Sequence, residues 1–169
     1  MYVPEVGSHQ EELAALRAMA EAAGAEVIPV SDITVIPAGE ASVTLYPPMG
    51  SGTSNEEGLF LLASAGDFDA LVTGDADSFV EDMLVKYCPI PDIELLLVGH
   101  HGSAGSTGER LLDALRPELA VISVGYNSYG HPAQSVLDRL RAGGAEVWRT
   151  DRDGSVTVSL RDGRVSVQT

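Results

Sequence analysis

Acidic and imidazole side chains follow three aliphatic runs of this sequence. Asp75 comes after the run 71–73, His100 and His101 come after the run 95–98, and His131 comes after the run 119–124. Carboxylate and imidazole groups together are a ligand set for zinc, manganese or iron. Singly, each has a simpler explanation, because Asp commonly caps a helix and His before Pro commonly lies in a loop. Their shared position after aliphatic runs indicates a common site.

Strands and helices alternate around these residues. The aliphatic runs have the composition of strands covered on both faces, as in a parallel sheet. Helices are predicted over 78–87, 109–115 and 133–141. The apolar face of the first helix is expected to contain Phe79, Val80, Met83, Leu84 and Tyr87. Because ligands bind beyond the carboxyl ends of such strands, we expect Asp75, His101 and His131 to meet at one edge of the sheet.

The remaining segments predict further short elements. A capping box at Ser8-His9-Gln10-Glu11 begins a helix over 10–23, and strands are expected over 26–30, 33–36 and 42–46, with a turn at 38–40. Segment 47–58 is predicted to be a loop, and the strands 59–64 and 69–73 flank a hairpin turn at Gly66-Asp67. A strand at 147–149 and a hairpin over 155–168 close the chain. No repeat or linker divides it, so we expect one α/β domain over 1–169, with a mixed sheet and flanking helices.

Composition excludes some classes of function. The 169 residues are 44% hydrophobic, which indicates a packed core, and no apolar stretch approaches the ~20 residues that span a bilayer. The net charge of −15 argues against a basic surface that coats nucleic acid. An anionic substrate would therefore need a local positive charge, which a divalent metal supplies. The single cysteine, Cys88, cannot form an internal disulfide.

Four motifs resemble one known family. They are TGDAD (73–77), VGHHGS (98–103), SVGYNSYGHP (123–132) and WRTDRDGSV (148–156). In this order and spacing they resemble the extracytoplasmic metallo-β-lactamase-type domain of the ComEC family of DNA-uptake competence proteins, over roughly 54–160. The resemblance implies an αββα sandwich, two divalent ions (zinc or manganese), and hydrolysis of DNA or another phosphodiester. It also implies a membrane channel domain in the same protein; outside the ComEC branch, a cytoplasmic hydrolase is expected.

The resemblance also implies roles for the metal-binding and catalytic residues. Asp75 matches the carboxylate that bridges two metal ions, and His101 suits a ligand of the second ion. His100 is expected to orient that ligand or to contact substrate, and the roles of His100 and His101 are interchangeable on sequence alone. His131 is either the last ligand or the proton donor to the leaving group. The implied reaction is two-metal hydrolysis, in which the ions activate water for attack on phosphorus.

Polar residues near these histidines are candidates for contact with substrate. Asn127 and Tyr129 are expected to hold a phosphate oxygen, and Ser103 and Ser106 are expected to bind the same anion. Each has a simpler alternative: Asn127 as a turn former, Tyr129 as a partly buried ring, and the two serines as helix caps.

The sequence departs from the family at one important motif. H-x-H-x-D-H, which supplies most of the family's metal ligands, does not occur, since the four histidines are His9, His100, His101 and His131. We therefore expect this chain to correspond to the second, C-terminal half of the domain, to bind metal weakly by itself, to hydrolyse little and to self-associate. The alternative is a non-catalytic, degenerate relative that binds a partner or a small anion.

Overall fold

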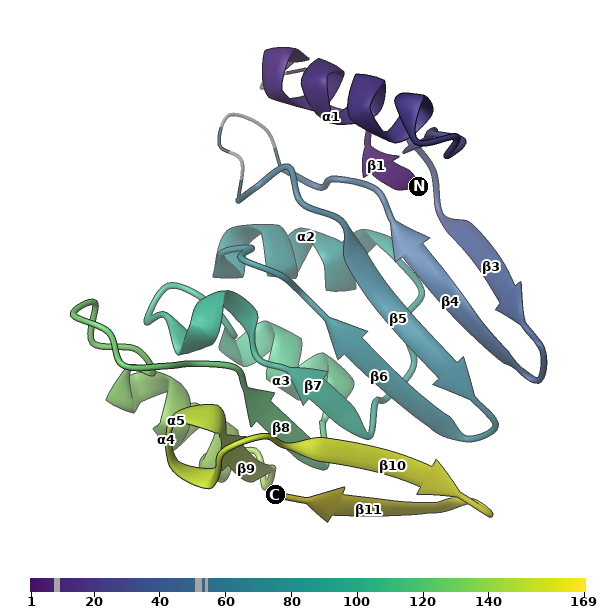
Figure 1. The fold of residues 1–169 in the computed structure, drawn as a ribbon. Coiled ribbons are helices and arrows are strands. Elements are labelled where there is room, and N and C mark those ends of the chain that lie inside the picture. The colour runs from purple at the N-terminus through teal and green to yellow at the C-terminus, as the bar shows by residue number, and fades with distance from the viewer. Residues whose placement is uncertain (8–9, 51–52, 54) are drawn as a thin grey trace.

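A seven-stranded mixed sheet forms the centre of the computed structural model, which describes residues 1–7, 10–50, 53 and 55–169 (Figure 1). Its strands follow one another in chain order: β3 (Thr34–Ala38), β4 (Ala41–Tyr46), β5 (Phe60–Ala65), β6 (Phe68–Val72), β7 (Leu95–Leu97), β8 (Leu119–Ile122) and β9 (Glu146–Arg149). The strands from β3 to β6 pair antiparallel and those from β6 to β9 pair parallel. The predicted mixed sheet is therefore confirmed.

The antiparallel half is built from tight hairpins. Gly39 and Glu40 form the turn between β3 and β4, within the predicted turn 38–40. Gly66 and Asp67 join β5 to β6, and Gly66 has a φ of +60°, which glycine adopts without the steric cost of a Cβ atom. This hairpin places Asp69–Val72, and with it the start of the Asp75 loop, beside the parallel half of the sheet.

A small N-terminal unit precedes the strand β3. The strands β1 (Tyr2–Pro4) and β2 (Ile28–Val30) pair parallel, and α1 (Gln10–Ala22) connects them. The β1 strand was not predicted, because three residues are too few to show the alternation of apolar and polar side chains that is typical of a strand. Ser8 and His9 of the predicted capping box lie outside the described residues.

Three helices cover one face of the sheet. They are α2 (Ser78–Tyr87), α3 (Glu109–Leu115) and α4 (Gln134–Ala142), which lie behind the strands in Figure 1. A 3-10 turn, η1 (Gly99–Gly102), follows β7. The short helix α5 (Thr150–Asp153) follows β9, and the hairpin β10 (Thr157–Arg161) and β11 (Arg164–Gln168) ends the chain. These parallel β-helix-β units are the ones that the sequence predicts.

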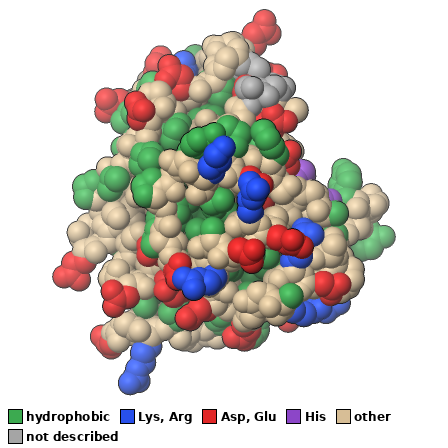
Figure 2. Space-filling view, turned by 180° about the vertical axis from the view of Figure 1, so that it is seen from behind, with side chains coloured by type: hydrophobic (Ala, Val, Ile, Leu, Met, Phe, Trp, Pro, Cys, Tyr) green, Lys and Arg blue, Asp and Glu red, His purple; other side chains and the backbone are tan. Residues whose placement is uncertain are grey.

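The helix-covered side of the molecule is predominantly acidic. Figure 2 shows Asp and Glu side chains spread over this side, with Lys and Arg side chains among them but no continuous basic band. This side agrees with the net charge of −15 and offers no broad basic contact for a nucleic-acid backbone. Across the described residues, no helix has the length and apolar character needed to cross a bilayer.

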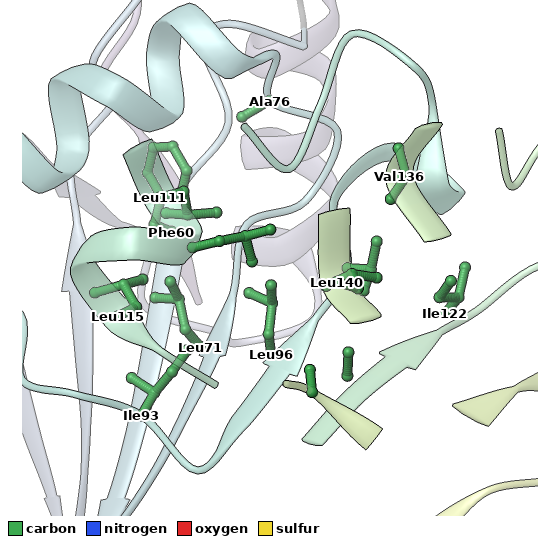
Figure 3. Packing of buried hydrophobic residues seen from close by; sticks show 14 of the residues in the cluster. Phe60, Leu71, Ala76, Ile93, Leu96, Leu111, Leu115, Ile122, Val136 and Leu140 are labelled. Atoms are coloured by element: carbon green, nitrogen blue, oxygen red, sulfur yellow. The ribbon is translucent and has the colours of Figure 1, made fainter. Parts of the chain in front are cut away.

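The hydrophobic core lies between the sheet and its helices. Leu71 of β6, Leu96 of β7 and Ile122 of β8 are fully buried against Leu111 of α3 and Leu140 of α4 (Figure 3). Burying side chains of this size stabilises a fold by about 1.5–3 kcal/mol each, before the loss of conformational entropy. The core thus fixes the strand ends that carry the site.

The opposite face of the sheet is also aliphatic. Leu61, Val72, Leu97 and Val121 are register partners from strand to strand and form one row, here called the open row. Because side chains alternate along a strand, the open row points away from the core residues Leu71 and Leu96. Three of its four members are only half-buried.

The buried face of α2 differs from the predicted one. Val80, Glu81 and Leu84 are buried, whereas Phe79 and Tyr87 are 69% and 62% exposed. Helical periodicity identified Val80 and Leu84 but assigned the flanking aromatic residues to the wrong side. The reason is that a carboxylate, Glu81, occupies the inner face, which an apolar pattern cannot reveal.

Candidate metal centre at the carboxyl edge of the sheet

The loops that follow β6, β7 and β8 meet at one edge of the sheet. Residues 98–108, between β7 and α3, are here called the His-His loop. The His100 N–H donates to the Gly74 carbonyl over 2.8 Å, which ties this loop to the residue before Asp75. The Ala133 N–H donates to the Gly102 carbonyl over 2.8 Å, which ties the same loop to the segment after His131. Three segments far apart in sequence are thereby brought together, as the strand-loop-helix pattern predicts.

Asp75 and His101 form a carboxylate-imidazole pair. The Nε2 atom of His101 lies 3.9 Å from Oδ1 of Asp75, and the two side chains are 58% and 47% exposed. The Nδ1 atom of His101 lies 2.7 Å from the Ser123 carbonyl oxygen. Because a carbonyl only accepts, Nδ1 carries the proton, and in the neutral ring Nε2 presents a lone pair toward Asp75. This is the arrangement by which proteins orient a metal-binding histidine.

The backbone that carries His100 and His101 is left-handed at both residues. Their φ angles are +47° and +54°, a region that non-glycine residues rarely occupy. Two such residues in succession cost of order 1–3 kcal/mol each, and this kind of strain is concentrated at functional sites. The conformation turns both imidazoles toward the edge where Asp75 and His131 lie. Sequence gave no signal of it, because the left-handed residues are not glycines.

His131 faces His100 from the loop after β8. Their rings are stacked, with centroids 5.7 Å apart, and the rings of His100 and His101 are 6.5 Å apart. Gly102 has a φ of +81°, and a Cβ atom there would lie 2.6 Å from Cβ of Pro132. Glycine therefore permits the close approach of the two histidine loops. The Nδ1 atom of His131 is buried and has no hydrogen-bond partner among the described residues.

Asn127 shapes the loop that presents His131. Its side-chain amide donates to the carbonyls of Gly125 and His131, over 2.9 and 2.8 Å. Its Oδ1 atom accepts from the N–H groups of Tyr129 and His131, over 3.1 and 3.0 Å. Both donors and both lone pairs are thus used within the loop, so the turn-forming alternative describes Asn127 better than contact with a phosphate.

A cavity of about 520 Å³ opens beside the histidines. It is lined by His100, His101 and His131, by residues 123–127, by Tyr129 and by Thr150. Tyr129 is 85% exposed rather than partly buried, and its ring meets the His131 ring edge-on at 5.9 Å. The Thr150 hydroxyl fixes the wall of the cavity, because it donates to the Val124 carbonyl and accepts from the Val124 N–H, both over 2.7 Å.

The two serines predicted to bind substrate differ in their exposure to solvent. Ser103 is half-buried, and its hydroxyl accepts from the Gly105 N–H over 3.4 Å. Ser106 is completely buried, and its hydroxyl donates toward the carbonyls of Gly99 and Ser103, over 2.8 and 3.0 Å. The Ser106 hydroxyl therefore holds the His-His loop closed in this structure, and its contact with an anion stays a prediction.

Glu81 and Arg139 clamp the end of the His-His loop, and sequence reasoning missed both. The carboxylate of Glu81, completely buried, accepts from the N–H groups of Thr107 and Gly108 over 2.9 and 3.0 Å. From the other side, Arg139 of α4 donates to the carbonyls of Thr107 and Ser106 over 3.1 and 2.9 Å. Burial raises the pKa of Glu81 to about 7, against the lowering effect of the two N–H groups. No signal in the sequence separates Glu81 from the exposed carboxylates of other helices.

Asp77, unlike Asp75, has a purely local role. It is the N-cap of α2, and its side chain accepts from the Val80 N–H over 3.0 Å. This agrees with the interpretation of Asp77 as a capping residue. The two carboxylates of the TGDAD motif are therefore matched neighbours with different surroundings, one facing His101 and one facing a helix terminus.

The donors present fit part of a metal site. Two ligand atoms on one tetrahedral zinc ion lie about 3.4 Å apart, so a small rotation of the exposed Asp75 or His101 side chain would suffice. The lone pair of His101 and the partnerless Nδ1 of His131 have the right chemistry. A catalytic zinc usually has about three protein ligands. Among the described residues, however, no group of three or more His, Cys, Asp or Glu side chains is placed to hold an ion.

Comparison with known proteins shows similarity to proteins of the competence type. No protein-family model matches the chain. It is 38% identical over 105 residues to ComE operon protein 3 of Bacillus subtilis, and 41% identical over 116 residues to competence protein ComA of Neisseria gonorrhoeae. These matches cover 62% and 68% of this chain but only 14% and 17% of the relatives, so the chain spans a small part of their length.

A solved structure supports the fold. CmlA, a diiron β-hydroxylase from Streptomyces venezuelae, superposes with a TM-score of 0.58 at 13% identity, over 89% of this chain and 38% of CmlA. The predicted metallo-β-lactamase-like fold is thereby confirmed, in the form of one mixed sheet with helices on one face. At this identity the likeness concerns the fold alone.

Proposed function

We propose that this chain supplies part of the active site of a metal-dependent phosphodiesterase. The proposal starts from two findings: the chain resembles part of the ComEC-type competence proteins, and it has a metallo-β-lactamase-like fold. The substrate proposed is DNA during uptake. In that setting the chain is an extracytoplasmic domain of a membrane protein. One observation carries the proposal: Nδ1 of His101 lies 2.7 Å from the Ser123 carbonyl oxygen, and Nε2 of the same ring lies 3.9 Å from Oδ1 of Asp75.

Asp75 and His101 are the residues proposed to hold metal. Zinc or manganese bound there supplies an activated water at neutral pH and neutralises negative charge on the phosphate. His101 is the better ligand of the two neighbouring histidines, because its Nε2 is the imidazole atom paired with Asp75. The acidic surface is compatible with this proposal, since the ions rather than lysines would meet the phosphate.

His100 and His131 are proposed to act on the substrate. Their rings stack on each other, and both residues line the cavity together with His101. In hydrolysis, the oxygen of a water molecule bonds to phosphorus and gives up a proton, the bond from phosphorus to the leaving oxygen breaks, and the leaving oxygen takes up a proton. We assign the delivery of this proton to His131, which Asn127 holds by its backbone N–H and carbonyl. Ser103 remains a proposed contact for a phosphate oxygen.

A non-catalytic binding domain is the second candidate. One observation favours it: within residues 1–7, 10–50, 53 and 55–169, no three-ligand metal group is found. A carboxylate-imidazole pair at the surface can also be a simple ion pair, worth ~1 kcal/mol or less. On this candidate the same cavity would bind a partner or an anion without turnover.

Hydrolysis by the native full-length protein separates the two candidates. We expect manganese- or zinc-supported cleavage of an oligonucleotide to fall by at least ~100-fold in Asp75→Ala. The matched variant Asp77→Ala removes the neighbouring carboxylate and a helix cap, at ~1 kcal/mol of stability, but should keep the rate. An unchanged rate in Asp75→Ala would reject the metal assignment, and no metal-supported cleavage by the unaltered protein would favour the binding domain.

A further inference from the structure

Two exposed tyrosines project from the loop that borders the cavity. Tyr126 is 105% exposed and Tyr129 is 85% exposed, and both line the cavity together with the three histidines. The loop extends beyond the edge of the sheet after β8 in Figure 1, and Figure 2 shows hydrophobic side chains projecting at the right-hand edge beside histidines. A single exposed aromatic residue is ordinary, but two from one loop on one cavity indicate a binding surface.

The lining of this cavity carries little charge. Among the described residues that line it, the only titratable side chains are those of histidine and tyrosine. A polyanion approaching a chain of net charge −15 gains nothing from its general surface. The contact area that Tyr126 and Tyr129 offer is aromatic, and aromatic side chains bind nucleobases by stacking at about 1–3 kcal/mol per base.

Tyr129 lies against His131, the residue proposed to protonate the leaving oxygen. Its backbone N–H is bonded to Oδ1 of Asn127 over 3.1 Å, and its ring meets the His131 ring edge-on at an interplanar angle of 76°. A nucleobase stacked on the free face of Tyr129 would therefore be separated by the tyrosine ring from His131.

We propose that Tyr126 and Tyr129 form a stacking platform for the bases of single-stranded nucleic acid at the entrance of the cavity. This inference rests on the proposed phosphodiesterase function and adds the form of its substrate. A single strand is favoured because its bases can leave one another and lie on a tyrosine ring, whereas the bases of a duplex are already stacked except at its ends. The platform is indifferent to base sequence, since every base has a flat face.

Binding of labelled oligonucleotides to the chain tests the platform. Fluorescence anisotropy would compare a 5′-labelled thymidine 12-mer, a 12-mer of abasic sites and a blunt duplex. We expect the single strand to bind more tightly than the other two, and Tyr126→Ala or Tyr129→Ala to weaken its binding by roughly 5- to 100-fold. Tyr126→Phe and Tyr129→Phe keep the ring and should stay within about threefold of the unaltered chain.

Tyr87→Ala is the matched control, because Tyr87 is also exposed but lies on α2, outside the lining of the cavity. It should not change binding. Equal affinity for the abasic and thymidine strands, or no effect of the two alanine substitutions, would overturn the platform, and the tyrosines would then contact another kind of partner. An absence of oligonucleotide binding at the highest concentration reached would also overturn it.

Hydrolysis of a small, base-free phosphodiester distinguishes failure of the platform from failure of the proposed function. If the native protein cleaves that diester in an Asp75-dependent manner but binding is independent of bases, the function stands and the platform is wrong. If binding depends on bases and on the two tyrosines but Asp75→Ala cleaves normally, the platform stands and the metal assignment is wrong.

Discussion

Replacing Glu81 by glutamine should change how the stability of this protein depends on pH. The side chain is completely buried, and both of its oxygens accept backbone N–H groups of the His-His loop. Burial raises its pKa from an ordinary 4.5 to about 7. The folded state therefore keeps the proton between these pH values while the unfolded state has lost it, so the free energy of unfolding falls as pH rises through this window.

The magnitude follows from the same pKa. A rise of the Glu81 pKa from 4.5 to about 7 corresponds to about 3 kcal/mol in the free energy of unfolding. This contribution is fully present below pH 4.5 and is lost once Glu81 is ionised in the folded state, above about pH 7. Asp77 and Arg139 also face Glu81, raising and lowering its pKa respectively, and both are retained in Glu81→Gln. That variant does not titrate at this position. It keeps one acceptor oxygen but turns an amide N–H toward a backbone N–H, at a cost of ~1–3 kcal/mol that is independent of pH.

Urea denaturation at pH 5, 6, 7 and 8 provides the assay. The fluorescence of Trp148, the single tryptophan, reports unfolding. We expect the stability advantage of the unaltered protein over Glu81→Gln to shrink by about 2.5 kcal/mol between pH 5 and pH 8, or to reverse, because a small part of the total is already lost at pH 5. Glu118→Gln, an exposed carboxylate, controls for the general charge of the chain and should parallel the unaltered protein. Parallel pH profiles for Glu81→Gln and the unaltered protein would show that Glu81 does not titrate with a raised pKa in the folded state.

Three further predictions concern the loops and the sheet. Gly102→Ala should destabilise by ~1–3 kcal/mol more than Gly130→Ala in urea denaturation, because both glycines have φ near +80° but only Gly102 would press a Cβ atom against Pro132; equal losses would contradict the close approach. Asn127→Ala should lower stability by ~1–2 kcal/mol and alter the NMR signals of His131, since four hydrogen bonds are lost; unchanged His131 signals would contradict the positioning role. The open row should make the isolated chain self-associate in sedimentation velocity, and a monomer throughout the micromolar range would contradict this.

Local patterns predicted the elements that deliver the site. The helix 109–115 and the two-residue turn at Gly66-Asp67 are found as predicted, because apolar periodicity and turn chemistry are written in neighbouring residues. The order of aliphatic strand, polar loop and helix was enough to bring Asp75, His101 and the His100-His131 stack to one edge. Asp77 was assigned to a helix cap for the same local reason.

Long-range features could not be predicted in this way. The partners of Glu81, Thr107 and Gly108, lie more than 20 residues away, so nothing in α2 itself distinguishes this glutamate from a solvated one. The buried hydroxyl of Ser106 and the left-handed backbone at His100 and His101 likewise arise from how loops pack. Single-sequence patterns report periodicity and capping, whereas these features depend on contacts between distant segments.

Imidazole ¹⁵N NMR of the chain with and without zinc would show whether Asp75 and Nε2 of His101 form part of a metal site. Without metal, we predict that His101 is protonated on Nδ1, as its bond to the Ser123 carbonyl requires. Zinc should then shift Nε2 of His101 with an affinity weaker than about micromolar, and Asp75→Ala, but not Asp77→Ala, should abolish the shift. A proton on Nε2 of neutral His101, or a zinc response that survives Asp75→Ala, would rule out this metal site.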